Sequence, residues 1–273
     1  MLKIGHYFFS TILFWTALSI LVEKLIKGNT KIDHYIKNRI VSIVHGLFGF
    51  VYPVMYILNP GNDSCSAGNA SDKFIITMSI SYFIYDFAAC LYYELYDISL
   101  IIHHVSVIIG YFIAYKSEFG AKVAISGLMI VESSNLVMHL RAILRLKGYN
   151  NTQLYNMLDI FYLVQYTLFR GLLCPINLYQ AFSCTGVPLV IQLGCLVLCG
   201  QSYMFIYIML KMFDIKITEQ RKRSKESVKL FWFTGNPILR PRKYTKYEKE
   251  TKVFWWIIFL SIILIIDIQW LSS

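Results

Sequence analysis

Long apolar stretches limit the fold of this chain more than any other feature. Eight windows are long enough to cross a hydrocarbon core of about 30 Å, which takes roughly 20 helical residues. They lie near residues 4–23, 40–58, 74–93, 98–115, 120–140, 154–178, 187–212 and 253–271. The runs lack the two-residue alternation of barrel strands, and a backbone in lipid must satisfy its own polar groups. The sequence therefore predicts an all-α polytopic membrane helix bundle with about eight transmembrane helices.

The charged residues outside these windows indicate which partners the protein binds. Only 15% of the residues are charged, against 56% hydrophobic, which excludes an ordinary soluble domain. The net charge of +10 is concentrated in the loop 213–252. We expect this loop to set the topology and to contact anionic headgroups, with membrane lipids rather than nucleic acid as partner. The alternative is a loop that docks an unidentified protein partner through Trp232 and Phe233.

The distribution of lysine and arginine predicts the topology. These residues gather in the loops on one side of the predicted bundle, which should therefore be cytosolic: 24–39, 94–97, 141–153 and 213–252. The first segment has no cleavage site after its apolar run, so we expect a retained helix. Both termini are then lumenal.

The glycosylation sequons at Asn62 and Asn69 fall on the lumenal side. Cys65 and Cys184 lie in two lumenal loops, where they could form one disulfide.

Ionisable residues inside the apolar segments are the main functional signal. His45, Asp86, His103 and Glu132 lie about 8 to 12 Å from the cytosolic ends of four different segments, at a rise of 1.5 Å per residue. Each such group costs about 2.5 to 3.5 kcal/mol at a helix centre. We therefore expect them to converge on one another or on water. A buried polar network that only specifies helix packing is the structural alternative.

Helical spacing extends this set along two stripes, and further polar residues lie in the fourth and sixth segments. Asp86 shares a face with Tyr82, and Glu132 shares one with Asn135 and His139. The adjacent His103 and His104 point about 100° apart, so one can face the bundle interior while the other contacts a neighbouring helix. The sixth segment adds Asp159, Gln165 and Arg170, and Pro175 is expected to kink its lumenal end.

These residue types suggest acid–base or nucleophilic chemistry. A histidine oriented by a carboxylate can act as a general base or accept an acyl group from a thioester. The catalytic candidates are His103, His104, Glu132 and Asp86, and the substrate-binding candidates are Arg39, His45, Asn135 and Arg170. Arg39 or Arg141 could hold a phosphate at the headgroup level. No cysteine–histidine spacing suggests a metal site, and we expect no bound cofactor, with acyl-CoA as the candidate co-substrate.

An ordered set of short motifs runs through the second to sixth segments. They are Arg39-x-x-Ser42-x-x-His45, Ser81-Tyr82-Phe83-x-x-Asp86, His103-His104, Glu132-Ser133-Ser134-Asn135 and Phe169-Arg170. This set resembles the TLC domain, whose family includes the ceramide synthases, the translocating-chain-associating membrane proteins and small TLC domain-containing proteins implicated in membrane lipid homeostasis. The resemblance implies a six-helix TLC-like core, usually in the endoplasmic reticulum. It divides the chain into an N-terminal anchor helix and basic loop (1–37), a TLC-like domain (38–213), a basic cytosolic loop (214–252) and a last transmembrane helix (253–273).

Two functions are consistent with this resemblance. In ceramide synthases the paired histidines belong to a catalytic motif together with downstream acidic residues. Only the histidines carry over, to His103 and His104, because Glu132-Ser133-Ser134-Asn135 resembles the small TLC proteins instead. The first hypothesis is an acyl-CoA-dependent lipid acyltransferase of lipid homeostasis. The second is a non-enzymatic lipid sensor, a regulator of membrane lipid composition or a cargo-binding protein that uses the same cavity.

Overall fold

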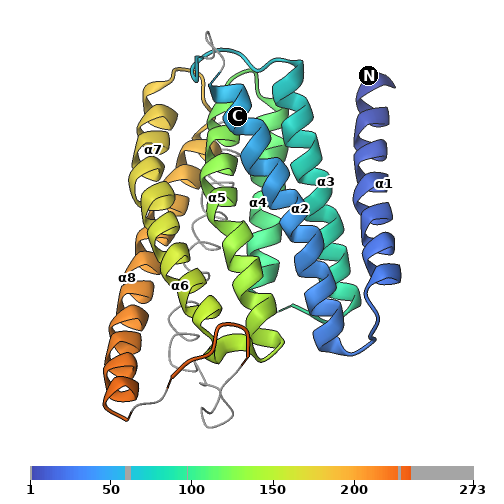
Figure 1. The fold of residues 1–273 in the computed structure, drawn as a ribbon. Coiled ribbons are helices and arrows are strands. Elements are labelled where there is room, and N and C mark those ends of the chain that lie inside the picture. Colours follow the sequence, from blue (N-terminus) through green and yellow to red (C-terminus); the bar gives the residue numbers. More distant parts are fainter. Residues whose placement is uncertain (1, 59–62, 97, 227–228, 235–273) are drawn as a thin grey trace.

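The described part of the chain consists of helices and the loops between them, without strands. The computed structural model describes residues 2–58, 63–96, 98–226 and 229–234 (Figure 1). The elements are α1 (Leu2–Leu25), α2 (Lys31–Ile57), α3 (Ala70–Tyr92), α4 (Ile98–Lys116), α5 (Ala121–Leu146), a 3-10 turn (Tyr149–Asn151), α6 (Gln153–Tyr166), a π-helical segment (Thr167–Leu173), α7 (Cys174–Ser183) and α8 (Leu189–Lys225). The last predicted segment, 253–271, lies outside the described residues.

Helices of membrane-spanning length make up most of the bundle. Five stretches in the described residues are long and apolar enough to cross a membrane: Tyr7–Leu25, Ala70–Tyr92, Ala121–Leu146, Gln153–Ser183 and Leu189–Lys225. A shorter apolar stretch, Leu100–Lys116, forms most of α4. Figure 1 shows these helices alternating in direction, with α2 and α4 between the others. The prediction of an all-α polytopic membrane protein is confirmed, and α2 and α4 cover two further predicted segments.

Two glycines let α2 approach α5 closely. A Cβ atom added at Gly49 would lie 2.8 Å from Cγ of Glu132, and one added at Gly46 would lie 3.3 Å from Oε2 of the same side chain. Small residues are typical of interfaces between membrane helices, because packing rather than the hydrophobic effect holds such helices together. The buried Glu132 therefore sits directly against the backbone of α2.

We predict that Gly49→Ala separates α2 from α5 and destabilises the protein by roughly 1 to 3 kcal/mol, since the added methyl group overlaps a buried side chain. Gly200→Ala on α8 is the matched control, because a Cβ atom there meets no other atom within 4 Å. Thermal unfolding of the purified protein in detergent measures both. Equal melting temperatures for the two variants would contradict the close contact.

Helix α1 packs into the bundle and is more than an anchor. The indole of Trp15 is fully buried and donates a hydrogen bond from Nε1 to the carbonyl of Met78 on α3 (3.0 Å). The hydroxyl of Thr11 on α1 shares a hydrogen bond with the hydroxyl of Ser81 on α3 (2.6 Å). At the other end of α1, Glu23 pairs with Lys37 of α2 (2.5 Å). These bonds fix α1 against both α2 and α3.

The sixth predicted segment contains a π-helical stretch directly before its proline. Pro175 has no N–H to donate to the carbonyl four residues earlier, that of Gly171. The hydroxyl of Tyr203 on α8 donates to this carbonyl instead (2.9 Å). The segment before Pro175 is thus π-helical and also carries Arg170, while the kink at Pro175 stays a prediction.

A disulfide joins the two longest loops at one end of the bundle. Cys65, before α3, is bonded to Cys184, after α7. The proposed pairing of these cysteines is therefore confirmed. Asn69, one of the two sequon asparagines on the predicted lumenal side, uses its side chain to cap α3 by accepting from the backbone N–H of Asp72 (3.1 Å). The other, Asn62, lies outside the described residues.

Removal of this bond should lower stability by about 2 kcal/mol or more, since it closes a long loop of the unfolded chain. Its two cysteines are 119 residues apart in sequence. We expect a reductant to lower the melting temperature of the wild type towards that of a Cys65→Ser, Cys184→Ser double variant. The double variant itself should not respond to reductant. A wild-type melting temperature that reductant leaves unchanged would be the contrary result.

Candidate functional site

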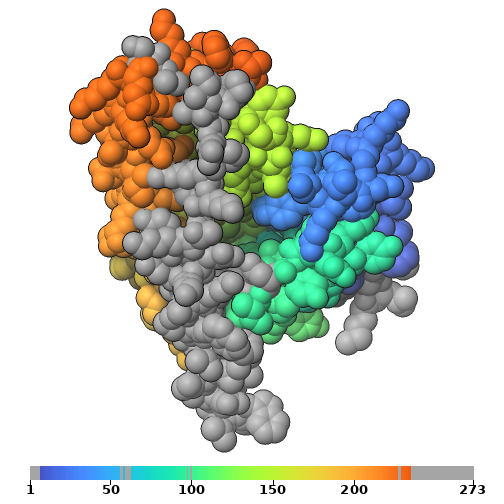
Figure 2. Space-filling model, turned by 90° about the horizontal axis from the view of Figure 1, so that it is seen from below, coloured from blue at the N-terminus to red at the C-terminus, as the bar shows by residue number. Residues whose placement is uncertain are grey.

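A cavity of about 730 Å³ lies between α2, α3, α4, α5, α6, the π-helical segment and α8. It extends from Tyr35 and Arg39 near the start of α2 to Val123 and Ile191 near the starts of α5 and α8. Figure 2 shows the end of the bundle where α2 begins and α8 ends. All eight candidate site residues line this cavity: Arg39, His45, Asp86, His103, His104, Glu132, Asn135 and Arg170. The structure thus brings together side chains from α2, α3, α4, α5 and the π-helical segment.

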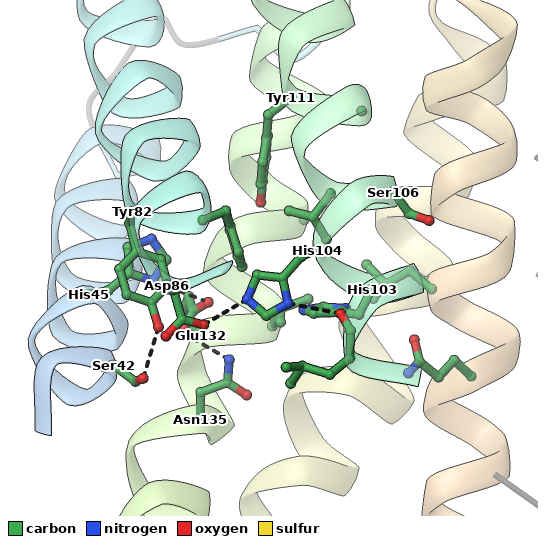
Figure 3. Close-up of a pocket in the computed structure, with 18 of the residues that line it drawn as sticks. Ser42, His45, Tyr82, Asp86, His103, His104, Ser106, Tyr111, Glu132 and Asn135 are labelled. Carbon is green, nitrogen blue, oxygen red and sulfur yellow. Dashed lines mark hydrogen bonds and ion pairs between the residues drawn. The ribbon is translucent and has the colours of Figure 1, made fainter. Parts of the chain in front are cut away.

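The buried His104 is held at both ring nitrogens (Figure 3). Nδ1 lies 2.9 Å from the carbonyl oxygen of Leu100 and Nε2 lies 2.7 Å from Oδ2 of Asp86. The carbonyl can only accept, so Nδ1 carries a proton, and one further proton is shared between Nε2 and the carboxyl group. Oδ1 of Asp86 accepts from the amide of Asn38 (2.7 Å). His104 and Asp86 therefore form a neutralised pair that links α4 to α3 and α2.

His103 is the member of the histidine pair that is partly exposed to the cavity. Its ring lies edge-on to His104, with a centroid distance of 5.5 Å and an interplanar angle of 86°. It also packs edge-on against Phe83 of α3. The division of roles between two adjacent histidines follows their expected angular separation, since His104 contacts the neighbouring helix and His103 lines the space inside the bundle.

Of the two candidate carboxylates, Glu132 lies beside His45 of α2. Its Oε1 is 3.6 Å from Nδ1 of His45, and its Oε2 accepts from the amide of Asn135 (3.0 Å). The ring of His45 stacks on that of Tyr82, with centroids 3.8 Å apart. The tyrosine hydroxyl donates to Ser42 (2.9 Å). The carboxylate bonded to the histidine pair is thus Asp86, while Glu132 belongs to a second cluster on α2, α3 and α5.

The motif Glu132-Ser133-Ser134-Asn135 docks the sixth segment onto α5. Arg170 donates from Nε to Ser134 (3.1 Å) and from NH2 to the carbonyl of Val131 and to Oδ1 of Asn135, each at 2.9 Å. Gln165 donates to the carbonyl of Ser133 (2.6 Å). Arg170 lines the cavity, but α5 already accepts most of its hydrogen bonds. Its principal role in this structure is to fix the π-helical segment.

The two arginines considered for phosphate binding differ in their surroundings. Arg141 forms an ion pair with Asp159 of α6, which also pairs with Lys216 of α8, and it does not line the cavity. Arg39 lines the cavity and donates to neutral groups, the hydroxyl of Tyr35 and Nδ1 of His139 (3.0 Å). The structure therefore rules out Arg141 as a cavity residue and retains Arg39.

Two supporting residues escaped the sequence reasoning. Asn38, which holds Asp86, lies at helical spacing from Ser42 and His45, and this polar stripe could have identified it. Trp15 packs edge-on against both Tyr82 and His45, at centroid distances of 5.3 and 5.7 Å. A tryptophan in an apolar helix gives no polar signal, so sequence alone could not assign it to the site.

Comparison with known proteins agrees with this architecture. The TLC domain family model matches residues 35–273, so the chain belongs to the TLC domain family. The match also includes the basic loop and the last apolar segment, which the resemblance over 38–213 had left out. TLC domain-containing protein 2 of Danio rerio is 23% identical over 198 residues, covering 69% of this chain and 80% of the relative. No solved structure matches the chain.

The Asp86 site predicts different outcomes for two substitutions. In Asp86→Asn the new amide can accept from Asn38 and donate to Nε2 of a neutral His104, so the fold should retain most of its stability. Asp86→Ala leaves a buried imidazole and amide unsatisfied and should cost about 3 kcal/mol. Thermal unfolding in detergent compares the two variants. Equal destabilisation by both would show that the hydrogen bonds are not the stabilising feature.

Proposed function

We propose that this TLC-domain protein binds the acyl chain of a lipid in its cavity and transfers an acyl group there, as an acyl-CoA-dependent acyltransferase of membrane lipid homeostasis. We place it in the endoplasmic reticulum with both termini in the lumen, as expected from the family and the charge distribution. The observation that carries the proposal is the histidine pair His103–His104 at the polar end of a long cavity, in which Asp86 neutralises His104.

The apolar half of the cavity supports an acyl ligand. Beyond Glu132 its walls are formed mainly by small and aliphatic side chains of α4, α5 and α8, including Gly127, Gly194 and Leu198. From Glu132 to Val123 the α5 helix rises about 14 Å at 1.5 Å per residue. This is close to the length of an acyl chain in one leaflet, about half of a 30 Å hydrocarbon core.

His103 is the residue that we assign to the reaction. Both ring nitrogens of His104 are occupied by Leu100 and Asp86, and His103 is the less buried of the two histidines that line the cavity. His103 takes the proton from the hydroxyl or amine of the acceptor as that atom attacks the thioester carbonyl. The carbon–sulfur bond breaks, and the departing thiolate of CoA takes the proton from His103. His104 and Asp86 hold His103 in position and do not exchange the proton themselves.

We predict that His103→Ala abolishes acyl transfer from a long-chain acyl-CoA to endogenous lipid acceptors in purified protein. Loss of a general base typically lowers the rate about 100-fold or more. Mass spectrometry of labelled lipid products measures the reaction. His34→Ala is the control, because His34 pairs with Glu23 away from the cavity and should leave turnover unchanged. Equal product from wild type and His103→Ala would contradict the assignment.

The closed hydrogen-bond network around His104 favours lipid binding without turnover as a second candidate function. Asp86 and His104 satisfy each other and link three helices, as a rigid wall of a binding site requires. A non-enzymatic lipid sensor or regulator of membrane lipid composition would use the same cavity without turnover. Native mass spectrometry separates the two functions. An unmodified lipid retained equally by wild type and His103→Ala, without product, would favour the sensor.

A further inference from the structure

We propose that the cavity takes a single-chain amphiphile with a phosphate group, whose phosphate binds Arg39 and whose chain points towards Val123 and Ile191. This inference rests on the proposed function for the acyl chain and adds the chemistry and the orientation of the ligand head. The phosphate can belong to a lysophospholipid or to the CoA portion of an acyl-CoA, and the experiment below distinguishes the two.

Arg39 carries a charge that no carboxylate of the described residues contacts directly, and Asp86, which acts on it at longer range, is already bonded to His104. NH1 donates to Nδ1 of His139 at 3.0 Å, NH2 donates to the hydroxyl of Tyr35, and the guanidinium lies 4.6 Å from the centroid of the Tyr35 ring. Because Nδ1 of His139 accepts this bond, the imidazole is neutral. Within the described residues, no aspartate or glutamate forms an ion pair with Arg39. A partly buried guanidinium is costly unless polar groups or an anion accompany it.

The other groups of the cavity do not supply that anion. Asp86 is bonded to His104 and Asn38, and Glu132 is bonded to Asn135 and faces His45. Arg170, the second arginine of the cavity, donates three hydrogen bonds to α5. Two hydrogen bonds orient Arg39, and its guanidinium has the planar donor geometry that matches a phosphate.

A second polar group at this end points to the rest of the ligand head. Oδ1 of Asn38 is buried, and no described group donates to it. Asn38 precedes Arg39 in the sequence and also lines the cavity. Its Nδ2 already donates to Oδ1 of Asp86. A hydroxyl or N–H of the ligand would satisfy the enclosed Oδ1 of Asn38 after a small displacement of the side chains that cover it. A phosphate beside such a donor is the arrangement found in a glycerophosphate or a pantetheine phosphate head.

The dimensions of the cavity favour one chain and fix its direction. From His139, at the level of Arg39, to Val123 the α5 helix rises about 24 Å. The polar side chains lie in the Arg39 half, and aliphatic residues such as Val190, Leu193 and Val197 line the other half. A volume of about 730 Å³ is within the range of sites for one drug-sized ligand, so it suits one chain with its head rather than a two-chain lipid.

Binding of three ligands with the same acyl chain tests the proposal by native mass spectrometry. The ligands are a lysophosphatidate, the matching acyl-CoA and the matching neutral monoacylglycerol. We expect a phosphate ligand to bind wild-type protein roughly tenfold or more tightly than the monoacylglycerol, as expected for a charge-assisted pair. Arg39→Gln should remove this preference and leave monoacylglycerol binding unchanged, and Arg39→Lys should retain part of it. A loss confined to one phosphate ligand identifies the source of the phosphate.

Arg145→Gln is the matched control, since Arg145 is exposed at the same end of α5 and does not line the cavity. It should bind all three ligands as the wild type does. Monoacylglycerol binding reports in each variant that the cavity is intact. If the wild type binds all three ligands equally, or if Arg39→Gln keeps the preference, the phosphate assignment is overturned and the acyl cavity stands. If no ligand binds the wild type, both the phosphate assignment and the proposed function fail.

Discussion

The pairing of Asp86 with His104 is the interaction on which the site depends. A carboxylate and an imidazole inside an apolar bundle are each costly, and a bond of 2.7 Å between them removes most of that cost by cancelling the charge. The amide of Asn38 and the carbonyl of Leu100 complete the hydrogen bonds. Three helices are thereby joined at one level of the membrane, and the adjacent His103 acquires a fixed position at the wall of the cavity.

Close helix packing supports this pair from the other side. Gly46 and Gly49 allow α2 to lie against Glu132, and the rest of the same motif on α5 accepts hydrogen bonds from Arg170 and Gln165. Trp15 fills the space behind Tyr82 and His45 from α1. The polar residues of the site are thus held by a shell of small, aromatic and amide side chains. That shell leaves a cavity with one polar end and one apolar end.

Sequence reasoning identified the residues of the site better than their partners. Helical spacing and depth brought Asp86, His103 and Glu132 to one level, because ionisable groups in lipid must meet other polar groups. Spacing could not decide which carboxylate meets which histidine, and Glu132 proved to lie beside His45. It also could not separate Arg39 from Arg141, since the Asp159 that neutralises Arg141 belongs to another helix. Trp15 carried no polar signal at all.

The sequence by itself determined the all-α membrane fold, the order of the helices and eight polar or charged side chains that line the cavity. Hydropathy and charge are properties of each segment and of the bilayer, so one chain read in order contains them. Only the tertiary structure decided that His104 binds Asp86, that Arg170 is bonded to α5 and that Arg39 forms no ion pair with a carboxylate of the described residues. These outcomes depend on the rotation and approach of neighbouring helices, which small residues such as Gly49 set and which no single segment encodes.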